Sequence, residues 1–113
     1  MRILREETAA LLVDMQDRLA PAVHRGAETL AAAARLIRGL GILEVPVVPI
    51  RHYPKGLGDL APELRAALGD HEPSDKITFS AWETPEIRER ILALGKRNLL
   101  VFEIGRASCR ERV

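Results

Sequence analysis

The chain has 113 residues, of which 47% are hydrophobic and 29% are charged, and this composition excludes a disordered or fibrous chain. Its 17 Lys and Arg residues nearly balance its 16 Asp and Glu residues, so the charge indicates no nucleic-acid partner. A single cysteine excludes an internal disulfide framework and a zinc site of several thiolates, and makes a reducing cytoplasm the expected location. Charged residues precede and interrupt the first apolar run, so neither a signal peptide nor a membrane span is predicted.

The N-terminal part of the chain predicts a strand followed by a helix. Residues 8–15 form a short apolar run that includes a carboxylate, which is typical of a central parallel strand covered on both faces. Residues 25–40 are rich in Ala and Leu and carry arginines on one stripe, which predicts a helix. Gly39 and Gly41 are expected to end this helix.

The middle of the chain predicts a second buried strand over 45–50. Pro49 has no N–H to donate to a sheet, which suggests that the strand ends there. The glycines and prolines of 51–64 predict a loop with turns, followed by a short helix over 62–68.

The C-terminal part predicts a brief extended segment over 76–79, a helix and a final strand. Thr84 is expected to cap the helix, Pro85 to occupy its first position, and Gly95 to end it. The apolar run 97–102 predicts the strand. Alternating strands and helices of this kind are typical of a single α/β domain with an open, doubly wound parallel sheet.

In such sheets ligands bind beyond the carboxyl ends of the strands, so polar residues there are candidates for a site. Asp14 could act as a general base or orient a cation, or it could only cap a turn. Lys76 could compensate a buried carboxylate, or be a solvated lysine. Gln16, judged alone, indicates an amide that satisfies backbone groups. Phe79 and Trp82 could wall a pocket or fill the core.

Two other kinds of site are not supported. The segment 53–64 contains glycines but lacks the spacing of a phosphate-binding fingerprint, and Lys55 precedes these glycines. His24, His52 and His71 are not arranged at the spacing of metal ligands. We therefore expect neither a metal nor a cofactor.

Three segments carry a more specific signal when they are taken together. They are ALLVDMQDRLAPAV (10–23), VPVVPIRHYPKGLGDLAPEL (45–64) and DKITFSAW (75–82), followed by the strand RNLLVF. In this order they resemble the isochorismatase-like cysteine hydrolases, and the resemblance covers residues 6–102. The chain is most similar to the branch with a Y-P-x-G-L-G loop, and it lacks the metal-binding D-x-H pattern of nicotinamidases.

The resemblance implies a three-layer α/β/α fold of Rossmann-like type and a catalytic triad of Asp, Lys and Cys. Asp14 matches the family's aspartate and Lys76 its lysine. In the family mechanism the aspartate takes the thiol proton, the sulfur attacks the carbonyl of a small amide or related compound, and water hydrolyses the thioester. Relatives often form homo-oligomers, which we expect of the full-length protein. The residues expected to border the substrate pocket are Gln16, His52, Tyr53, Phe79 and Trp82.

The loop departs from the family pattern just before Tyr53. Relatives usually carry an acidic residue and an amide there, whereas this chain has Arg51 and His52. These two residues could favour a substrate that bears a carboxylate, or they could be solvated loop residues, and substrate choice stays open.

The greater departure concerns the nucleophile. In relatives the last strand leads into Gly-Ile-Glu and then to a His and the catalytic Cys, whereas here it leads into EIGRASCRERV (103–113). Cys109 lies at a similar distance, but no apolar helix follows it. The segment resembles the translation of an adapter used in short-read DNA libraries. We therefore expect 1–102 to be the N-terminal part of a hydrolase domain, 103–113 to be non-native, and the chain to be inactive without its nucleophile.

Three alternatives remain open. The segment 103–113 could be a real charged extension of the protein. The intact protein could hydrolyse a vinyl ether with the aspartate as proton donor and no cysteine, as some relatives do. The chain could also be a non-catalytic binding or assembly module.

Overall fold

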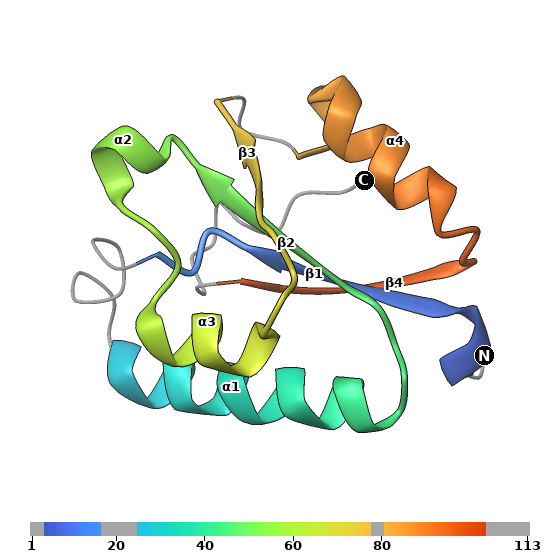
Figure 1. Ribbon diagram of the computed structural model, residues 1–113, viewed down its shortest axis with the longest axis horizontal. Coiled ribbons are helices and arrows are strands. Elements are labelled where there is room, and N and C mark those ends of the chain that lie inside the picture. The colour runs from blue at the N-terminus through green and yellow to red at the C-terminus, as the bar shows by residue number, and fades with distance from the viewer. Residues whose placement is uncertain (1–3, 17–24, 78–80, 104–113) are drawn as a thin grey trace.

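A parallel four-stranded sheet forms the centre of the computed structural model, which describes residues 4–16, 25–77 and 81–103. The strand order is β3-β2-β1-β4, and every neighbouring pair is parallel (Figure 1). The predicted parallel α/β sheet with a central first strand is confirmed. The strands are β1 (Thr8–Val13), β2 (Val47–His52), β3 (Ser74–Lys76) and β4 (Asn98–Glu103).

Helices cover both faces of the sheet, which gives three layers (Figure 1). Helices α1 (Gly26–Ile42) and α3 (Pro62–Leu68) lie on one face, and α4 (Pro85–Ala93) lies on the other. The predicted helix over 62–68 is confirmed. Three short turns complete the described elements, namely the 3₁₀ turns Arg5–Glu7 and Ala81–Glu83 and the single-turn helix α2 (Pro54–Leu57).

Strand β1 is apolar after Thr8 because both of its faces are buried. Successive side chains of a strand point to opposite faces. Ala10 and Leu12 accordingly belong to the core cluster beneath α1 and α3, while Leu11 belongs to the cluster beneath α4. The expectation of a strand covered on both sides is confirmed.

The expectation that Gly39 and Gly41 end the first helix is wrong, because α1 continues through both to Ile42. A glycine inside a helix costs roughly 0.5–1 kcal/mol. The buried stripe of α1, which includes Ile37 and Leu40, outweighs this cost by packing on the sheet.

The expectation that the second strand ends at Pro49 is also wrong, because β2 runs to His52. N–H groups of β1 and of the residue that follows it donate to the carbonyls of Pro46 and Ile50. Alternate residues of β2 therefore turn their backbone groups toward β1. Pro49 therefore faces the β3 side. Pairing with β3 begins only at Ile50, so no neighbouring acceptor needs an N–H from Pro49.

Helix α4 follows the predicted signals with one difference. Pro85 occupies its first turn, and Gly95 adopts a left-handed φ of 65° just beyond its end. Thr84 takes the N-cap position, but its hydroxyl does not make the capping hydrogen bond. The extended segment expected over 76–79 is misplaced, because β3 covers Ser74–Lys76 and Ile77 lies in a bend. Phe79 lies outside the described residues.

Strand β4 lies at one edge of the sheet and pairs with β1. Its residues Leu99, Leu100 and Val101 are 36%, 36% and 43% exposed. The edge of the described sheet therefore presents apolar surface.

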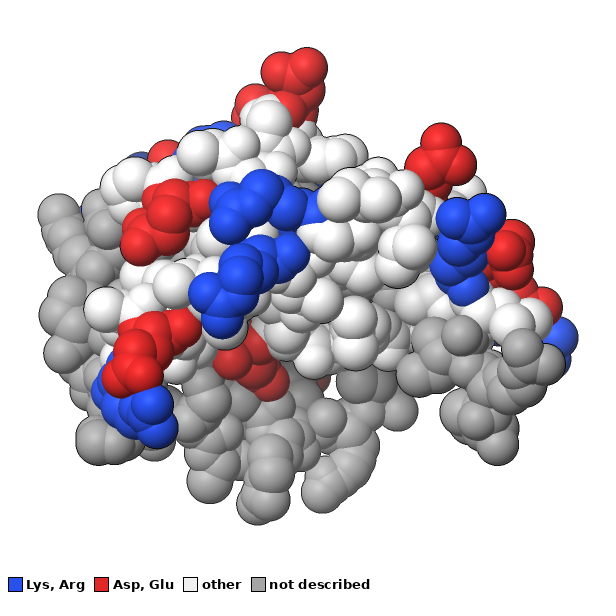
Figure 2. Space-filling model, turned by 90° about the horizontal axis from the view of Figure 1, so that it is seen from below, with Lys and Arg blue, Asp and Glu red and all other residues white. Residues whose placement is uncertain are grey.

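The surface on the side of α1 and α3 carries interspersed charges. Figure 2 shows Lys and Arg alternating with Asp and Glu on this face, with uncharged surface between them. Among the described helices, none combines the length and apolar character that crossing a bilayer requires.

Candidate active site

Three polar side chains meet at the carboxyl edge of the sheet because their strands are parallel. Asp14 follows β1, His52 ends β2, and Lys76 ends β3. The register supports this placement, since His52 pairs with Lys76. Asp14 adopts a left-handed φ of 59°, a conformation that is uncommon for residues other than glycine and is concentrated at functional sites.

The Lys76 ammonium is the centre of this group. Its Nζ lies 3.4 Å from Oδ2 of Asp14, 3.3 Å from Oδ1 of Asp14 and 3.3 Å from Nδ1 of His52. The side chain of Lys76 is only 1% exposed, and that of Asp14 is 21% exposed. An ammonium donates and cannot accept, so Nδ1 of His52 is the acceptor in this contact. His52 thus contacts the buried ammonium of Lys76.

The Oδ1 atom of Asp14 has capacity left for a donor. It is buried and accepts no hydrogen bond in the described part of the chain. The Nζ of Lys76 lies within ion-pair distance of it, but without the geometry of a hydrogen bond. A buried carboxylate oxygen normally accepts hydrogen bonds. This atom is therefore able to accept a hydrogen bond from a further donor.

Gln16 links the loop after β2 to the end of β1 through hydrogen bonds. Its amide nitrogen donates to the carbonyls of His52 at 3.0 Å and Gly58 at 2.7 Å, and its Oε1 accepts from the His52 N–H at 2.7 Å. The residue is fully buried. In this arrangement the amide satisfies backbone groups at both ends of α2.

The loop between those two ends is compact. Tyr53 adopts a left-handed φ of 42°, and its N–H donates to the carbonyl of Lys76 at 2.9 Å. Gly56 packs beneath the Tyr53 ring, where a Cβ would lie 2.6 Å from a ring carbon. Only glycine fits at this position without displacing the ring.

The side chain of Arg51 forms ion pairs with acidic side chains. It makes two hydrogen bonds to Asp75, at 2.7 and 3.0 Å, and one to Asp59 at 3.0 Å. Arg65 also binds Asp59, at 3.1 and 3.2 Å. The hydrogen bonds that Arg51 donates to Asp75 raise the pKa of Arg51 above its ordinary value, and Asp59 adds to the shift. This network joins β2, β3 and α3.

The pKa of Asp59 is lowered by the same network. Burial, the largest single influence, acts to raise it. Hydrogen bonds from Arg65, the Leu60 N–H and Arg51 together outweigh burial, because they favour the charged carboxylate.

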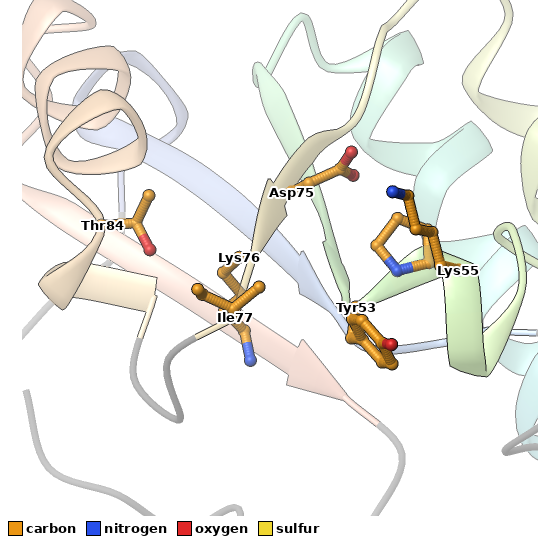
Figure 3. A pocket seen from close by; sticks show the side chains of 7 residues that line it. Tyr53, Lys55, Asp75, Lys76, Ile77 and Thr84 are labelled. Carbon is orange, nitrogen blue, oxygen red and sulfur yellow. The ribbon is translucent and has the colours of Figure 1, made fainter.

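A pocket of about 370 Å³ opens beside Lys76. In Figure 3, Tyr53 and Lys55 approach it from the α2 side, β3 contributes Asp75 to Ile77, and Thr84 comes from the start of α4. The volume lies near the lower end of the range for small-molecule sites. The lining residues are Tyr53, Pro54, Lys55, Asp75, Lys76, Ile77 and Thr84.

The structure brings together some of the residues proposed from sequence and not others. Asp14, His52 and Lys76 meet directly, and Tyr53 lines the adjacent pocket. Trp82 packs partly buried against the core cluster beneath α4. Cys109, like Phe79, lies outside the described residues.

Sequence reasoning missed Lys55 and Thr84 as pocket residues. The position of Lys55 directly after Tyr53 and Pro54 in the Y-P-K-G-L-G loop was a usable signal. Thr84 carried only a capping signal. Within residues 4–16, 25–77 and 81–103, no three His, Cys, Asp or Glu residues gather as a metal site.

Residues 8–102 match the isochorismatase domain family. The chain belongs to the isochorismatase family. The isochorismatase domain-containing protein 2 of Danio rerio is 32% identical over 94 residues, which cover 83% of this chain and 46% of that protein. The protein of the same name from Rattus norvegicus is 42% identical over 65 residues, or 58% of this chain and 31% of that protein.

Several solved structures share the fold. The MAR1 ribonuclease of Caenorhabditis elegans is 29% identical with a TM-score of 0.81, over 91% of this chain and 53% of that one. The YcaC gene product of Escherichia coli, an octameric hydrolase of unknown specificity, has a TM-score of 0.78 at 24% identity, over 91% of this chain and 52% of that one. The present chain spans about half the length of such relatives or less.

Proposed function

We propose that the full gene product is a cysteine-dependent hydrolase of a small amide or related carbonyl compound, with Asp14 as its base and Lys76 as the cation beside that base. The observation that carries the proposal is the buried contact between the Lys76 ammonium and Asp14, whose Oδ1 has room for one further donor. Membership of a family that generally consists of hydrolases supports it.

The chemistry needs each of these groups in a distinct role. A thiol is mostly protonated at neutral pH and becomes nucleophilic when a base takes its proton. Oδ1 of Asp14 is the acceptor for that proton. Lys76 compensates the negative charge of Asp14, and His52 accepts a hydrogen bond from Lys76 and so fixes the direction of the ammonium.

The proposed reaction has two halves. The thiol proton moves to Asp14 while the sulfur forms a bond to the carbonyl carbon. The C–N bond then breaks, the proton moves to the departing amine, and a thioester remains. Water attacks the thioester carbon, the acid is released and the thiol is restored.

The geometry of β4 supports a nucleophile that follows it. Glu103 pairs with Val13, the residue directly before Asp14. A segment that leaves β4 thus starts from the edge of the sheet where Asp14 lies. We propose that the native continuation after Phe102 carries the cysteine and that the adapter-like residues 103–113 replace it. The family match ends at Phe102, which is consistent with this view.

Sequencing the gene beyond Phe102 from independent DNA tests the proposal. We expect a Gly-Ile-Glu-x-His-x-Cys segment. The same segment with another residue in place of Cys would favour vinyl ether hydrolysis with Asp14 as proton donor. A confirmed EIGRASCRERV would contradict the proposal and favour a non-catalytic module.

Activity provides the second test. In a chain with the cysteine-bearing segment, Cys→Ala and Asp14→Ala should each abolish hydrolysis of a panel of small amides while the fold is retained. Substantial hydrolysis by either variant would contradict the mechanism. Size-exclusion chromatography of the same chain tests the expected homo-oligomer, a state for which the octameric YcaC gene product provides a precedent.

A further inference from the structure

The pocket beside Lys76 offers a ligand a mostly apolar wall. The Tyr53 ring, Pro54 and Ile77 form that wall, and the residues Tyr53 and Ile77 are 52% and 81% exposed. Exposed apolar side chains around a concave site favour the body of a small organic molecule, because its binding removes this surface from water.

Some charged groups of the pocket already have partners within the protein, and others are available to a ligand. Asp75 is held by two hydrogen bonds from Arg51. The Lys76 ammonium is held by Asp14 and His52. Lys55 forms no ion pair or hydrogen bond within the described part of the chain. The charge that remains available to a ligand is therefore positive, and it sits on Lys55.

Lys55 is carried on a short element that is fixed at both ends. The Gln16 amide binds the backbone of His52 before α2 and of Gly58 after it. The close packing of Gly56 under the Tyr53 ring fixes the turn between them. In Figure 3 the Lys55 side chain approaches the pocket from the side opposite Thr84. Binding a ligand to Lys55 thus requires little ordering of its backbone.

We propose that this pocket binds a small amide that bears a carboxylate, with the carboxylate on Lys55, the apolar body against Tyr53 and Ile77, and the amide toward Lys76. The proposal rests on the hydrolase function for the identity of the reacting group. Sequence reasoning had connected a carboxylate-bearing substrate with Arg51 and His52. Because Arg51 binds Asp59 and Asp75, the structure assigns that role to Lys55.

Two matched probes test the assignment without any need for turnover. Terephthalamate and terephthalamide have nearly the same size and shape, but only the first carries a carboxylate. Their binding to the 113-residue chain is measured by titration of its ¹⁵N NMR spectrum at neutral pH and low salt. We expect terephthalamate to bind about fivefold more tightly, the upper end for a single partly exposed ion pair. Tyr53 and Ile77 resonances should shift.

Three variants locate the preference. Lys55→Met keeps most of the side-chain stem and removes the charge, so it should abolish the preference, whereas Lys55→Arg should retain it. Lys96→Met is the control, because Lys96 binds the Glu6 carbonyl and does not line the pocket. Equal titrations by the two probes, absence of binding by both, or a preference that survives Lys55→Met would overturn the inference. A preference without hydrolysis in the cysteine-bearing chain would refute the proposed function alone.

Discussion

Replacing Gln16 by methionine removes the polar contacts that fasten the loop around α2 to β1. Methionine has a similar length and no hydrogen-bonding amide, so it fills the same buried space. The change leaves the N–H and carbonyl of His52 and the carbonyl of Gly58 without the partners they have now. An unsatisfied buried group costs about 1–3 kcal/mol.

The expected loss of stability follows from these three groups. They are partly buried, so each is placed at the lower end of that range, and Gln16→Met should reduce the free energy of unfolding by about 3 kcal/mol. Urea unfolding followed by circular dichroism measures this change. Arg65→Met is the matched control, because its contacts to Asp59 are largely exposed and should be worth at most about 1 kcal/mol.

Comparing the two variants tests whether the hydrogen bonds of Gln16 stabilise the loop more than a largely exposed ion pair does. Similar small losses, below about 1 kcal/mol, for Gln16→Met and Arg65→Met would refute the role of Gln16 as the fastening of the loop. A large loss for Gln16→Met alone is the predicted result. NMR shifts confined to α2 and its neighbours would agree with a local effect.

Three further changes should give measurable results. Gly39→Ala should raise the free energy of unfolding by about 0.5–1 kcal/mol, because a Cβ there meets nothing within 4 Å; a loss would contradict the packing of α1. Lys76→Met should destabilise by about 3 kcal/mol by leaving the Asp14 charge uncompensated, and adding Asp14→Asn should recover most of this loss; additive losses would argue against the pair. Because the folded-state pKa of Asp59 is lowered, its charged carboxylate stabilises the fold above about pH 4, and this stabilisation is lost as the pH falls below that value. Asp59→Asn should therefore reduce the loss of unfolding free energy at acid pH, measured by urea titrations at several pH values. An unchanged pH dependence would contradict the network.

The order of elements was predictable because apolar runs and turn residues are local signals. The strand β1, the helix over 62–68 and the Gly95 stop all follow from them. The errors occurred where tertiary contacts outweigh a local preference. Packing of the buried stripe carries α1 past Gly39, and the short length of β3 makes Pro49 harmless inside β2.

The candidate site divides in the same way. Asp14 and Lys76 were found because they stand at strand ends within recognisable segments. The acidic partners of Arg51 were not predicted, because Asp59 and Asp75 are 8 and 24 positions away and resemble ordinary acidic residues of loops. The prediction that the Gln16 amide satisfies backbone groups is confirmed, but these groups lie 36 and 42 positions away, and no local pattern reveals which they are.

The reactivity of the native cysteine tests the central claim most directly. In a chain whose continuation after Phe102 carries that cysteine, its alkylation by iodoacetamide at neutral pH is timed by intact mass, with and without Asp14→Asn. If Asp14 takes the thiol proton, the variant should react at least about tenfold more slowly, because less thiolate is present. Equal rates, or a native continuation without a cysteine, would contradict the account.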